Sequence, residues 1–521
     1  MLRRWFFASC LLSAGALAGC VSALGDSTVD DDALPDASTT ADGGGTSDDA
    51  STPGEDGSKP DVAADASADA PDDADAGCAP PTVACGDGCF DLADTKEHCG
   101  TCETACVDGD GTSVCGQRRC ECLNADHTYC ANAGCFATKT DSQHCGDTCT
   151  ACGPGSSCQG GACVCDANFA ECQPGTCTSL ATDTNCGRCG NTCGAGASCV
   201  QGKCRFAETG ATCPPWGLAY GATSGSIYWT EFCSGGGAIR RCPAATGCQT
   251  VPVALYSAPD DSLPCGIVAA KGSDDSEYYF NTDNQGPNNN RLWRSLGTGA
   301  DRRDWSGISA GGPGAIVTNG TYVWWGTSGL IYRSSVNSEG ATAVLDANPS
   351  ILTPGSAPQG VALDATYVYA ARQGVPNKQD GVVACPIAND CTTSGEIQLF
   401  TGAGVSAIVS DGTNVFVSTR TSGVDSVYRC PLAGCGASAQ PFWTANVDLN
   451  PGRPIPLAVD ANNVYINSRS GELLECVKDQ VTCATPKVLH PNVNAGSMIT
   501  LDGYVYWTEG MAPRGVYRTQ P

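Results

Sequence analysis

Histidine is scarce in this chain, which limits the catalytic chemistry that the sequence can support. Only His98, His127, His144 and His490 occur among 521 residues, and the first three lie in a cysteine-rich region. Metal hydrolases and acid–base mechanisms commonly use clustered histidines. The sequence shows no supporting motif for a Ser-His-Asp triad on His490, no Walker loop and no dinucleotide fingerprint. We expect no catalytic residue, no cofactor and no metal, and the sequence leans against an enzyme.

Cysteine is the residue type whose spacing is most informative. Of 37 cysteines, 24 lie between residues 78 and 204 and form three units of eight. The units start 44 and 43 residues apart, at Cys78, Cys122 and Cys165. An even number in each unit predicts that each unit closes on itself with four disulfides, although eight cysteines allow about a hundred pairings.

These units need disulfides because they lack the residues for a core. Residues 78–204 contain no Ile, Met or Trp, and such small units cannot bury enough apolar surface to fold alone. Disulfides worth about 2–4 kcal/mol each supply the missing stability. The Cys99-x-x-Cys102 and Cys186-x-x-Cys189 spacings could instead hold zinc, an alternative that an oxidising compartment disfavours. The units resemble Cys-rich modules of bacterial surface lipoproteins and, loosely, EGF-like modules, which implies a spacer or adhesive stalk.

The first twenty residues predict that compartment. Arg3 and Arg4 precede an apolar run over residues 5–18, as in a secretory signal. The tetrapeptide Leu17-Ala18-Gly19-Cys20 resembles the bacterial lipoprotein signal, which implies that residues 1–20 are a signal peptide and that Cys20 is lipidated. We expect export and a lipid anchor at the cell envelope, at the outer membrane, facing the periplasm or the exterior. The apolar run of the signal is too short to span a membrane, and no other run reaches the required length of about 18 residues.

Residues 21–77 have the composition of a disordered acidic tether. They carry sixteen Asp or Glu residues against Lys59 and contain no aromatic residue. Such a segment cannot bury enough apolar surface to offset the entropy of ordering it. The whole chain has a net charge of −27, which argues against nucleic acid as a partner.

Residues 205–521 contain a repeat that predicts a β-propeller. Seven short strands with an aromatic centre recur 41 to 51 residues apart, centred on Tyr228, Tyr279, Trp324, Tyr369, Phe416, Tyr465 and Tyr506. A small apolar strand and a tight turn precede each one, and a third strand and, in most units, a fourth follow. Four strands every 40–50 residues is the propeller pattern. We therefore predict an all-β protein with a seven-bladed propeller, six blades being the alternative.

Two phrases in this repeat resemble a known propeller class. Tyr228-Trp229-Thr230-Glu231 and residues 506–509 are similar to the YWTD signature, with Glu in place of Asp. That class has six blades, so the resemblance supports the architecture and little more. The last unit ends after its third strand, and Arg205-Phe206-Ala207 is the expected outer strand. This closure resembles that of WD40 propellers and removes open sheet edges.

Eight propeller cysteines recur between the third and fourth strands of four blades. Their short spacing predicts disulfides that clasp each hairpin, with the candidate pairs Cys242/Cys248, Cys385/Cys391, Cys430/Cys435 and Cys476/Cys483. Cys213, Cys233 and Cys265 remain, and two of these three are expected to pair.

Three further sets of residues are candidates for binding. Five arginines occupy corresponding positions in five blades and could form a ring that binds an anion; they are Arg241, Arg294, Arg333, Arg429 and Arg518. Pairing with nearby acidic side chains is the alternative that we favour. Four aspartates recur at one turn, where turn formation explains them better than calcium binding; they are Asp364, Asp411, Asp460 and Asp502. Trp216, Trp305 and Trp443 are expected in exposed loops, where they could contact a ligand.

This organisation favours a non-catalytic, envelope-anchored binding or adhesion lipoprotein. Its propeller would present a surface for an extracellular protein or polysaccharide. One alternative is a lactonase- or glycosidase-like hydrolase with carboxylates at the central channel, since propellers serve both roles. Another is a structural envelope component without a specific ligand.

Overall fold

The computed structural model describes residues 77–209, 213–233, 236–248, 250–257, 264–283, 291–307, 315–327, 330–346, 360–375, 377–389, 391–392, 395–421, 423–435, 439–446 and 455–521. The expected signal peptide with Cys20, and the expected tether apart from Gly77, lie outside these residues. Within them, no helix has the length and apolar character of a membrane span.

Each of the three cysteine-rich modules consists of two short antiparallel hairpins. Their strands are β1 (Val83–Cys85), β2 (Gly88–Phe90), β3 (Ser113–Gly116), β4 (Arg119–Cys122), β5 (Thr128–Cys130), β6 (Gly134–Phe136), β7 (Ser156–Gln159), β8 (Ala162–Cys165), β9 (Phe169–Gln173), β10 (Thr176–Ser179), β11 (Ser198–Val200) and β12 (Lys203–Glu208). A single 3-10 turn, η1 (Lys96–His98), lies in the first module. The modules have almost no apolar core, as their composition predicts.

All 24 cysteines of the modules form disulfides, and every module has the same connectivity. Numbered along each module, the first cysteine pairs with the third, the second with the fifth, the fourth with the seventh and the sixth with the eighth. In the first module these bonds are Cys78–Cys89, Cys85–Cys102, Cys99–Cys115 and Cys106–Cys120. The other two modules repeat this order. The prediction that each unit closes on itself is confirmed, and this density of disulfides indicates an extracellular or envelope location.

The described chain divides into two compact units. One contains residues 77–152 and 157–164, which are the first module and most of the second. The other contains residues 153–156 and 165–521, so the third module folds together with the propeller.

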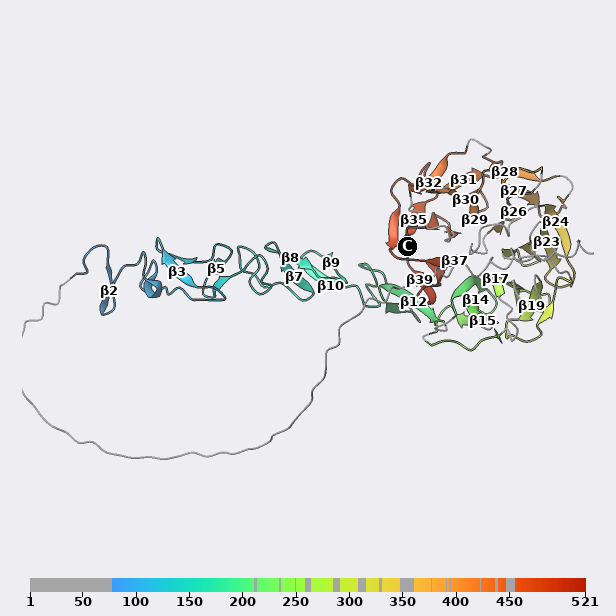
Figure 1. Cartoon of the computed structure of the whole chain (residues 1–521). Coiled ribbons are helices and arrows are strands. Elements are labelled where there is room, and N and C mark those ends of the chain that lie inside the picture. The colour runs from blue at the N-terminus through green and yellow to red at the C-terminus, as the bar shows by residue number, and fades with distance from the viewer. Residues whose placement is uncertain are drawn as a thin grey trace, which may run out of the picture. The chain divides into compact units, whose positions relative to one another are not determined.

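The propeller has seven blades around a common centre (Figure 1), which confirms the predicted fold class and blade number. Six are four-stranded antiparallel sheets, and the seventh belongs to a five-stranded sheet in which β11 of the third module pairs with β12. The first blade contains β13 (Pro215–Gly221), β14 (Ser226–Cys233), β15 (Gly236–Pro243) and β16 (Tyr256–Ser257). The second contains β17 (Pro264–Lys271), β18 (Glu277–Asp283), β19 (Leu292–Leu296) and β20 (Arg303–Asp304). The third contains β21 (Ile316–Thr318), β22 (Tyr322–Gly326), β23 (Leu330–Ser335) and β24 (Thr342–Asp346).

The remaining blades continue the same order. The fourth contains β25 (Val361–Leu363), β26 (Tyr367–Arg372), β27 (Gly381–Pro386) and β28 (Ile397–Thr401). The fifth contains β29 (Val405–Ser410), β30 (Asn414–Thr421), β31 (Val424–Pro431) and β32 (Pro441–Asn446). The sixth contains β33 (Leu457–Val459), β34 (Asn463–Asn467), β35 (Leu473–Val477) and β36 (Lys487–His490). The seventh contains β37 (Ala495–Leu501), β38 (Tyr504–Glu509), β39 (Gly515–Thr519) and β12.

The aromatic residue at the centre of each second strand packs between blades. All seven are buried, with exposed fractions of 2 % or less. Because neighbouring blades cover both faces of each sheet, the second strands are apolar on both sides instead of alternating with polar residues. This explains why the aromatic triplets were visible in the sequence.

Strand β12 closes the ring by serving as the outer strand of the seventh blade. Arg205 lies opposite Tyr517 and Ala207 opposite Val516 in the antiparallel register. Figure 1 shows β12 beside β39. Phe206 is fully buried and meets Tyr506 edge-on at 5.3 Å between ring centroids. The predicted closure over Arg205-Phe206-Ala207 is confirmed.

The sequence pattern predicts the fourth strand of the first blade over residues 250–255, but the structure places it after them. It forms only at Tyr256 and Ser257, opposite Ile239 and Ala238. Pro252 lies in the expected segment and has no N–H for a sheet hydrogen bond, so pairing begins after it.

Cys213 forms a disulfide, and Cys265 is buried.

The four candidate cysteine pairs of the propeller are all disulfides: Cys242–Cys248, Cys385–Cys391, Cys430–Cys435 and Cys476–Cys483. Each also holds its loop against the preceding blade. The N–H of the second cysteine donates to a carbonyl on the outer strand of that blade, at 2.7–3.0 Å; the pairs are Cys248 to Phe206, Cys391 to Val344, Cys435 to Leu399 and Cys483 to Phe442. The clasps therefore support four of the seven blade interfaces.

Removal of one clasp should have a modest effect on stability. In the double variant Cys385→Ser/Cys391→Ser, we expect the free energy of unfolding to fall by about 2 kcal/mol, because the bond closes a short loop. Urea unfolding of the variant and of the parent protein measures this change. The Cys391 N–H can still reach Val344, so a loss of the folded state would contradict this account.

Candidate functional site

The first strands of all seven blades enclose a central channel. Its volume is about 440 Å³, and most of the side chains that line it are aliphatic. Among the described residues of this lining there is no Asp, Glu, His, Lys or Arg. The lining therefore offers no carboxylate to the hydrolase interpretation, which needs acidic groups at this place.

The five candidate arginines lie on third strands, and none of them is among the residues that line the channel. Arg333 donates to the carbonyl of Ile387 at 2.6 Å, and Arg429 donates to that of Lys478 at 2.6 Å. Both carbonyls belong to the clasped loop of the next blade. The partners are therefore backbone carbonyls, where we expected acidic side chains.

The other three arginines pack against aromatic rings or hydroxyl groups. Arg294 lies over the rings of Tyr278 and Trp305, at 3.5 and 4.0 Å from the ring centroids. Arg241 contacts the Tyr228 hydroxyl. Arg518 donates to Tyr506 and to two carbonyls of the third module. The contacts of Arg294 and Arg241 lie within one blade, and Arg518 links the seventh blade to the third module.

The recurring aspartates form turns. Oδ1 of Asp364 accepts from the N–H groups of Thr366 and Tyr367, and Oδ2 accepts from the Tyr369 hydroxyl at 2.5 Å. Asp411 and Asp460 make the same pair of backbone contacts. Burial and the neighbouring Asp364 raise the pKa of the Tyr369 hydroxyl, which stays protonated and keeps donating. These contacts agree with the favoured turn interpretation.

The Tyr-Trp-Thr-Glu phrases have a structural role that the sequence did not reveal. Thr230 Oγ1 accepts from the N–H of Gly217 at 2.8 Å and donates to the carbonyl of Cys265, in the next blade, at 2.9 Å. Glu231 is fully buried and accepts from Trp229 and Arg240 at 2.9 and 2.7 Å. The last blade repeats the threonine link to the first, since Thr508 donates to the carbonyl of Trp216 at 2.9 Å. The sequence signal for this role is a threonine two residues after the aromatic centre of the second strand, Thr230 after Tyr228 and Thr508 after Tyr506.

The expectation that three tryptophans lie in exposed loops is wrong. Trp443 belongs to β32 and is 5 % exposed, and Trp305 follows β20 and is 2 % exposed. Trp305 donates to the carbonyl of Ser335 at 2.7 Å. Trp216 lies within β13 and is half-buried. Trp305 packs in an apolar cluster with Phe280, and Trp443 packs in another with Phe416, where an indole is more stable than in water.

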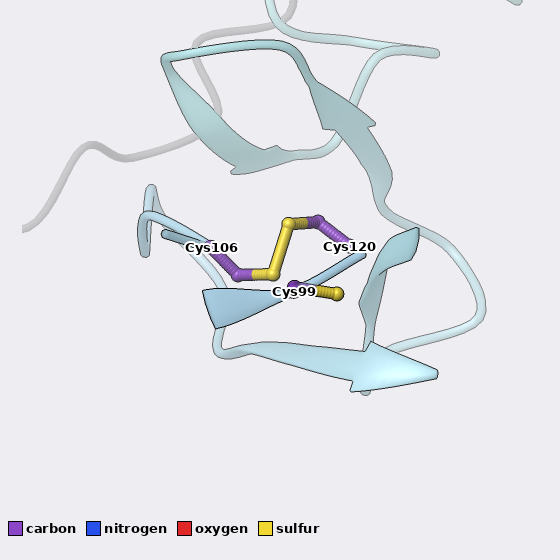
Figure 2. A group of neighbouring side chains, drawn as sticks. All are labelled: Cys99, Cys106 and Cys120. Carbon is purple, nitrogen blue, oxygen red and sulfur yellow. A yellow bond between two sulfur atoms is a disulfide. The ribbon is translucent and has the colours of Figure 1, made fainter. Parts of the chain in front are cut away.

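In each module the sulfur atoms of three cysteines lie close together, as they would in a metal site, but all of them belong to disulfides. In the first module, Cys99 lies within 4.8 Å of the bonded pair Cys106–Cys120. Figure 2 shows that disulfide with the Cys99 sulfur beside it, and Cys99 is itself bonded to Cys115. Sulfur atoms in disulfides are not thiolate ligands, so the zinc alternative does not hold for these cysteines.

His490 is buried where the third module meets the propeller. It is 2 % exposed, and its Nε2 lies 3.4 Å from Asn191 Nδ2 of the module. Its ring is 5.9 Å from that of Trp507. Burial, together with the positive charges of Arg188 and Lys203, lowers the pKa of His490 from 6.5 to about 4.

His490 should make the folded protein sensitive to acid. Because the folded state holds the neutral ring and the unfolded state binds a proton below pH 6.5, the free energy of unfolding should fall as the pH drops from 6.5 towards 4. We expect a contribution of about 3 kcal/mol at most. Urea unfolding of the full-length protein across this range measures it. His490→Gln should remove this part of the pH dependence, and an unchanged profile in that variant would contradict the assignment.

Comparisons with known proteins identify no family for the chain. No family model matches it, and no curated protein matches it. Among solved structures, the nidogen/laminin complex is 17 % identical at a TM-score of 0.32, with 45 % of this chain and 80 % of that chain covered. A puromycin-hydrolyzing peptidase of Mycobacterium tuberculosis is 13 % identical at a TM-score of 0.42, with 60 % and 53 % covered. The computationally designed Ika8 protein is 12 % identical at a TM-score of 0.37, with 61 % and 99 % covered. At these scores the likeness carries no argument about fold or function.

The fold and the channel define the class as a disulfide-clasped, seven-bladed β-propeller preceded by cysteine-rich modules. A binding role is consistent with this class.

Proposed function

We propose that this protein is an exported, non-catalytic binding protein, held at the cell envelope by a lipid on Cys20. The tether and the cysteine-rich modules act as its stalk, and the propeller presents a surface to an extracellular protein or glycan. Export is supported by the disulfides, because such bonds persist only in oxidising compartments.

The difference between the two propeller faces carries this proposal. On one face, the turns between first and second strands are short, and the loops between third and fourth strands carry the four clasps. On the other face, the connections differ widely in length, from residues 402–404 between β28 and β29 to residues 347–360 between β24 and β25. Variable connections on a rigid scaffold are where proteins commonly place binding residues.

The charge balance of the protein restricts the partner. A net charge of −27 disfavours polyanions, so we expect a neutral or basic glycan, or a protein with a basic surface. The channel lining supports the non-catalytic assignment, since its described side chains include no Asp, Glu, His or Lys, the commonest general acids and bases.

A glycan array and binding to purified envelope proteins test the proposal on the full-length protein. We expect saturable binding that is lost when residues 347–359 are replaced by a short Gly-Ser linker. Asp411→Asn, on the clasped face, is the matched control and should bind normally. Failure to bind any member of either panel would contradict the proposal. Turnover of lactones or aryl glycosides would favour the hydrolase alternative.

A further inference from the structure

We propose that a small pocket between the fourth and fifth blades binds the acetamido group of an N-acetylated sugar. This inference rests on the proposed function and deepens it, because it names the part of a glycan that the propeller recognises. The pocket has a volume of about 120 Å³. Sites for whole small molecules measure about 300–1,000 Å³, so this pocket suits one substituent of a larger ligand.

The pocket opens on the face of the propeller that carries the connections of variable length. Thr401 ends β28, and Gly402 and Ala403 belong to the connection from β28 to β29. Thr419 and Thr421 lie at the end of β30 in the next blade. The second and fourth strands of an antiparallel blade run in the same direction, so these ends lie on one face. Ala403 and Thr421 are exposed there, which makes the pocket accessible from solvent.

Aromatic rings and methyl groups form the apolar part of the pocket. The rings of Phe400 and Tyr428 line it, with 4.8 Å between their centroids, and Ala403 and Ala439 add methyl groups. Gly402 leaves room beside the Phe400 ring, since a Cβ atom at this position would lie 2.8 Å from Phe400 Cζ. The methyl group of an acetamido substituent can pack against these rings.

Threonine hydroxyl groups form the polar part. Thr419 is only 3 % exposed, and its hydroxyl group has no hydrogen-bond partner within the described parts of the chain. The same is true of the Thr401 hydroxyl, while Thr421 donates to the carbonyl of Val424 at 3.4 Å and keeps its lone pairs as acceptors. A hydroxyl group can both donate and accept. These threonines therefore suit an amide, which offers a carbonyl oxygen and an N–H group.

The absence of charge in the lining restricts the ligand further. Among its described residues there is no Asp, Glu, His, Lys or Arg. A carboxylate or an ammonium group would lose water here without gaining a charged partner, which costs far more than the transfer of a neutral amide. A hydroxyl group on the sugar would satisfy a threonine but has no methyl group to cover the rings. An acetamido group matches both parts of the pocket.

Saturation-transfer NMR titration of the full-length protein with N-acetylglucosamine, glucosamine and glucose tests the pocket. The three sugars differ only in the substituent on one carbon, and at about pH 6 the amine of glucosamine is protonated. We expect saturable binding of N-acetylglucosamine. Glucosamine and glucose should bind at least about tenfold more weakly, because one brings an unpaired charge and the other lacks the methyl and amide groups.

Two variants connect this binding to the pocket. Thr419→Val keeps the shape of the side chain and should weaken the binding of N-acetylglucosamine about fivefold, because one hydrogen bond is lost. Thr401→Val tests the other blade in the same way and keeps the test decisive if the first variant fails to fold. Thr342→Val is the matched control, since Thr342 is an exposed residue of the outer strand β24 and does not line the pocket; its affinity should equal that of the parent protein.

Four results would overturn the inference. They are no saturable binding of N-acetylglucosamine, equally tight binding of glucose, parental affinity in the folded threonine variants, and preferential binding of Nε-acetyl-lysine, which would assign the pocket to an acetylated protein. Saturable binding of another glycan or of an envelope protein, without binding of N-acetylglucosamine, would remove this inference and leave the proposed function standing.

Discussion

A fragment that starts at Arg205 is expected to be far less stable than one that starts at Cys165, although both contain residues 205–208 of β12 and all strands from β13 to β39. The shorter fragment lacks Cys204, which is bonded to Cys193. It also loses the Lys203 ammonium group, which lies 3.2 Å from the buried Glu509. The closing strand β12 would lack its first two residues, Lys203 and Cys204, as well as the module that precedes it.

The contacts between the third module and the seventh blade explain the size of this effect. Arg518, which is 4 % exposed, donates to the carbonyls of Cys193 and Ala195 at 2.9 and 2.6 Å. Thr519 donates to Asn191 Oδ1 at 3.0 Å. Cys186, Cys193 and Cys204 belong to the same apolar cluster as residues of the first and seventh blades.

We expect the shorter fragment to lose on the order of 5 kcal/mol, since the third module with its four disulfides is removed together with several hydrogen bonds to a charged group. That is comparable with the whole stability of a typical domain. Urea unfolding of the two fragments measures the difference. The fragment from Cys165 should match the propeller transition of the full-length protein, and equal midpoints for the two fragments would contradict the account.

Reduction of the disulfides should unfold the first two modules completely. Each relies on four bonds, and loss of even one from a small domain costs about 2–5 kcal/mol. The buried side chains of the first module are mostly cysteines, with Leu92 and Ser113 in addition. We therefore expect no residual cooperative unfolding of these modules after reduction.

The propeller should respond differently, because its blades contain apolar cores of their own. One cluster joins Tyr369, Val382, Leu399 and Val415 across the fourth and fifth blades. Amide hydrogen exchange with and without a reductant separates the two cases. Protection should vanish over residues 78–164 and persist in the second strands of the blades. Retained protection in the modules would contradict their dependence on disulfides.

Much of the fold could be predicted because the relevant signals are local and repeated. The aromatic centres of the second strands, such as Tyr369 and Tyr465, recur at each blade and are buried as expected. Asp364 accepts hydrogen bonds from two backbone N–H groups of the turn that follows it, which is the turn role that the sequence pattern predicts. The short spacing of Cys385 and Cys391 similarly identified a clasp.

The features that escaped prediction depend on contacts between distant residues. Arg333 could not be assigned to the carbonyl of Ile387 without the arrangement of the blades. The docking of Asn191 beside His490 joins residues 299 positions apart. Trp443 was misplaced because a polar neighbourhood in sequence concealed a buried position in β32. The disulfide connectivity was open for the same reason, since spacing alone leaves about a hundred pairings.

The central claim is that this chain leaves the cytosol, so that its cysteines become crosslinks and its propeller faces outside molecules. Mass spectrometry of the protein isolated from its native cells, alkylated before digestion and left unreduced, tests this directly. We predict envelope-fraction protein with an acylated Cys20 at its N-terminus and the pairing Cys78–Cys89, Cys85–Cys102, Cys99–Cys115 and Cys106–Cys120. Alkylated thiols at these positions, in protein from the cytosolic fraction, would contradict it.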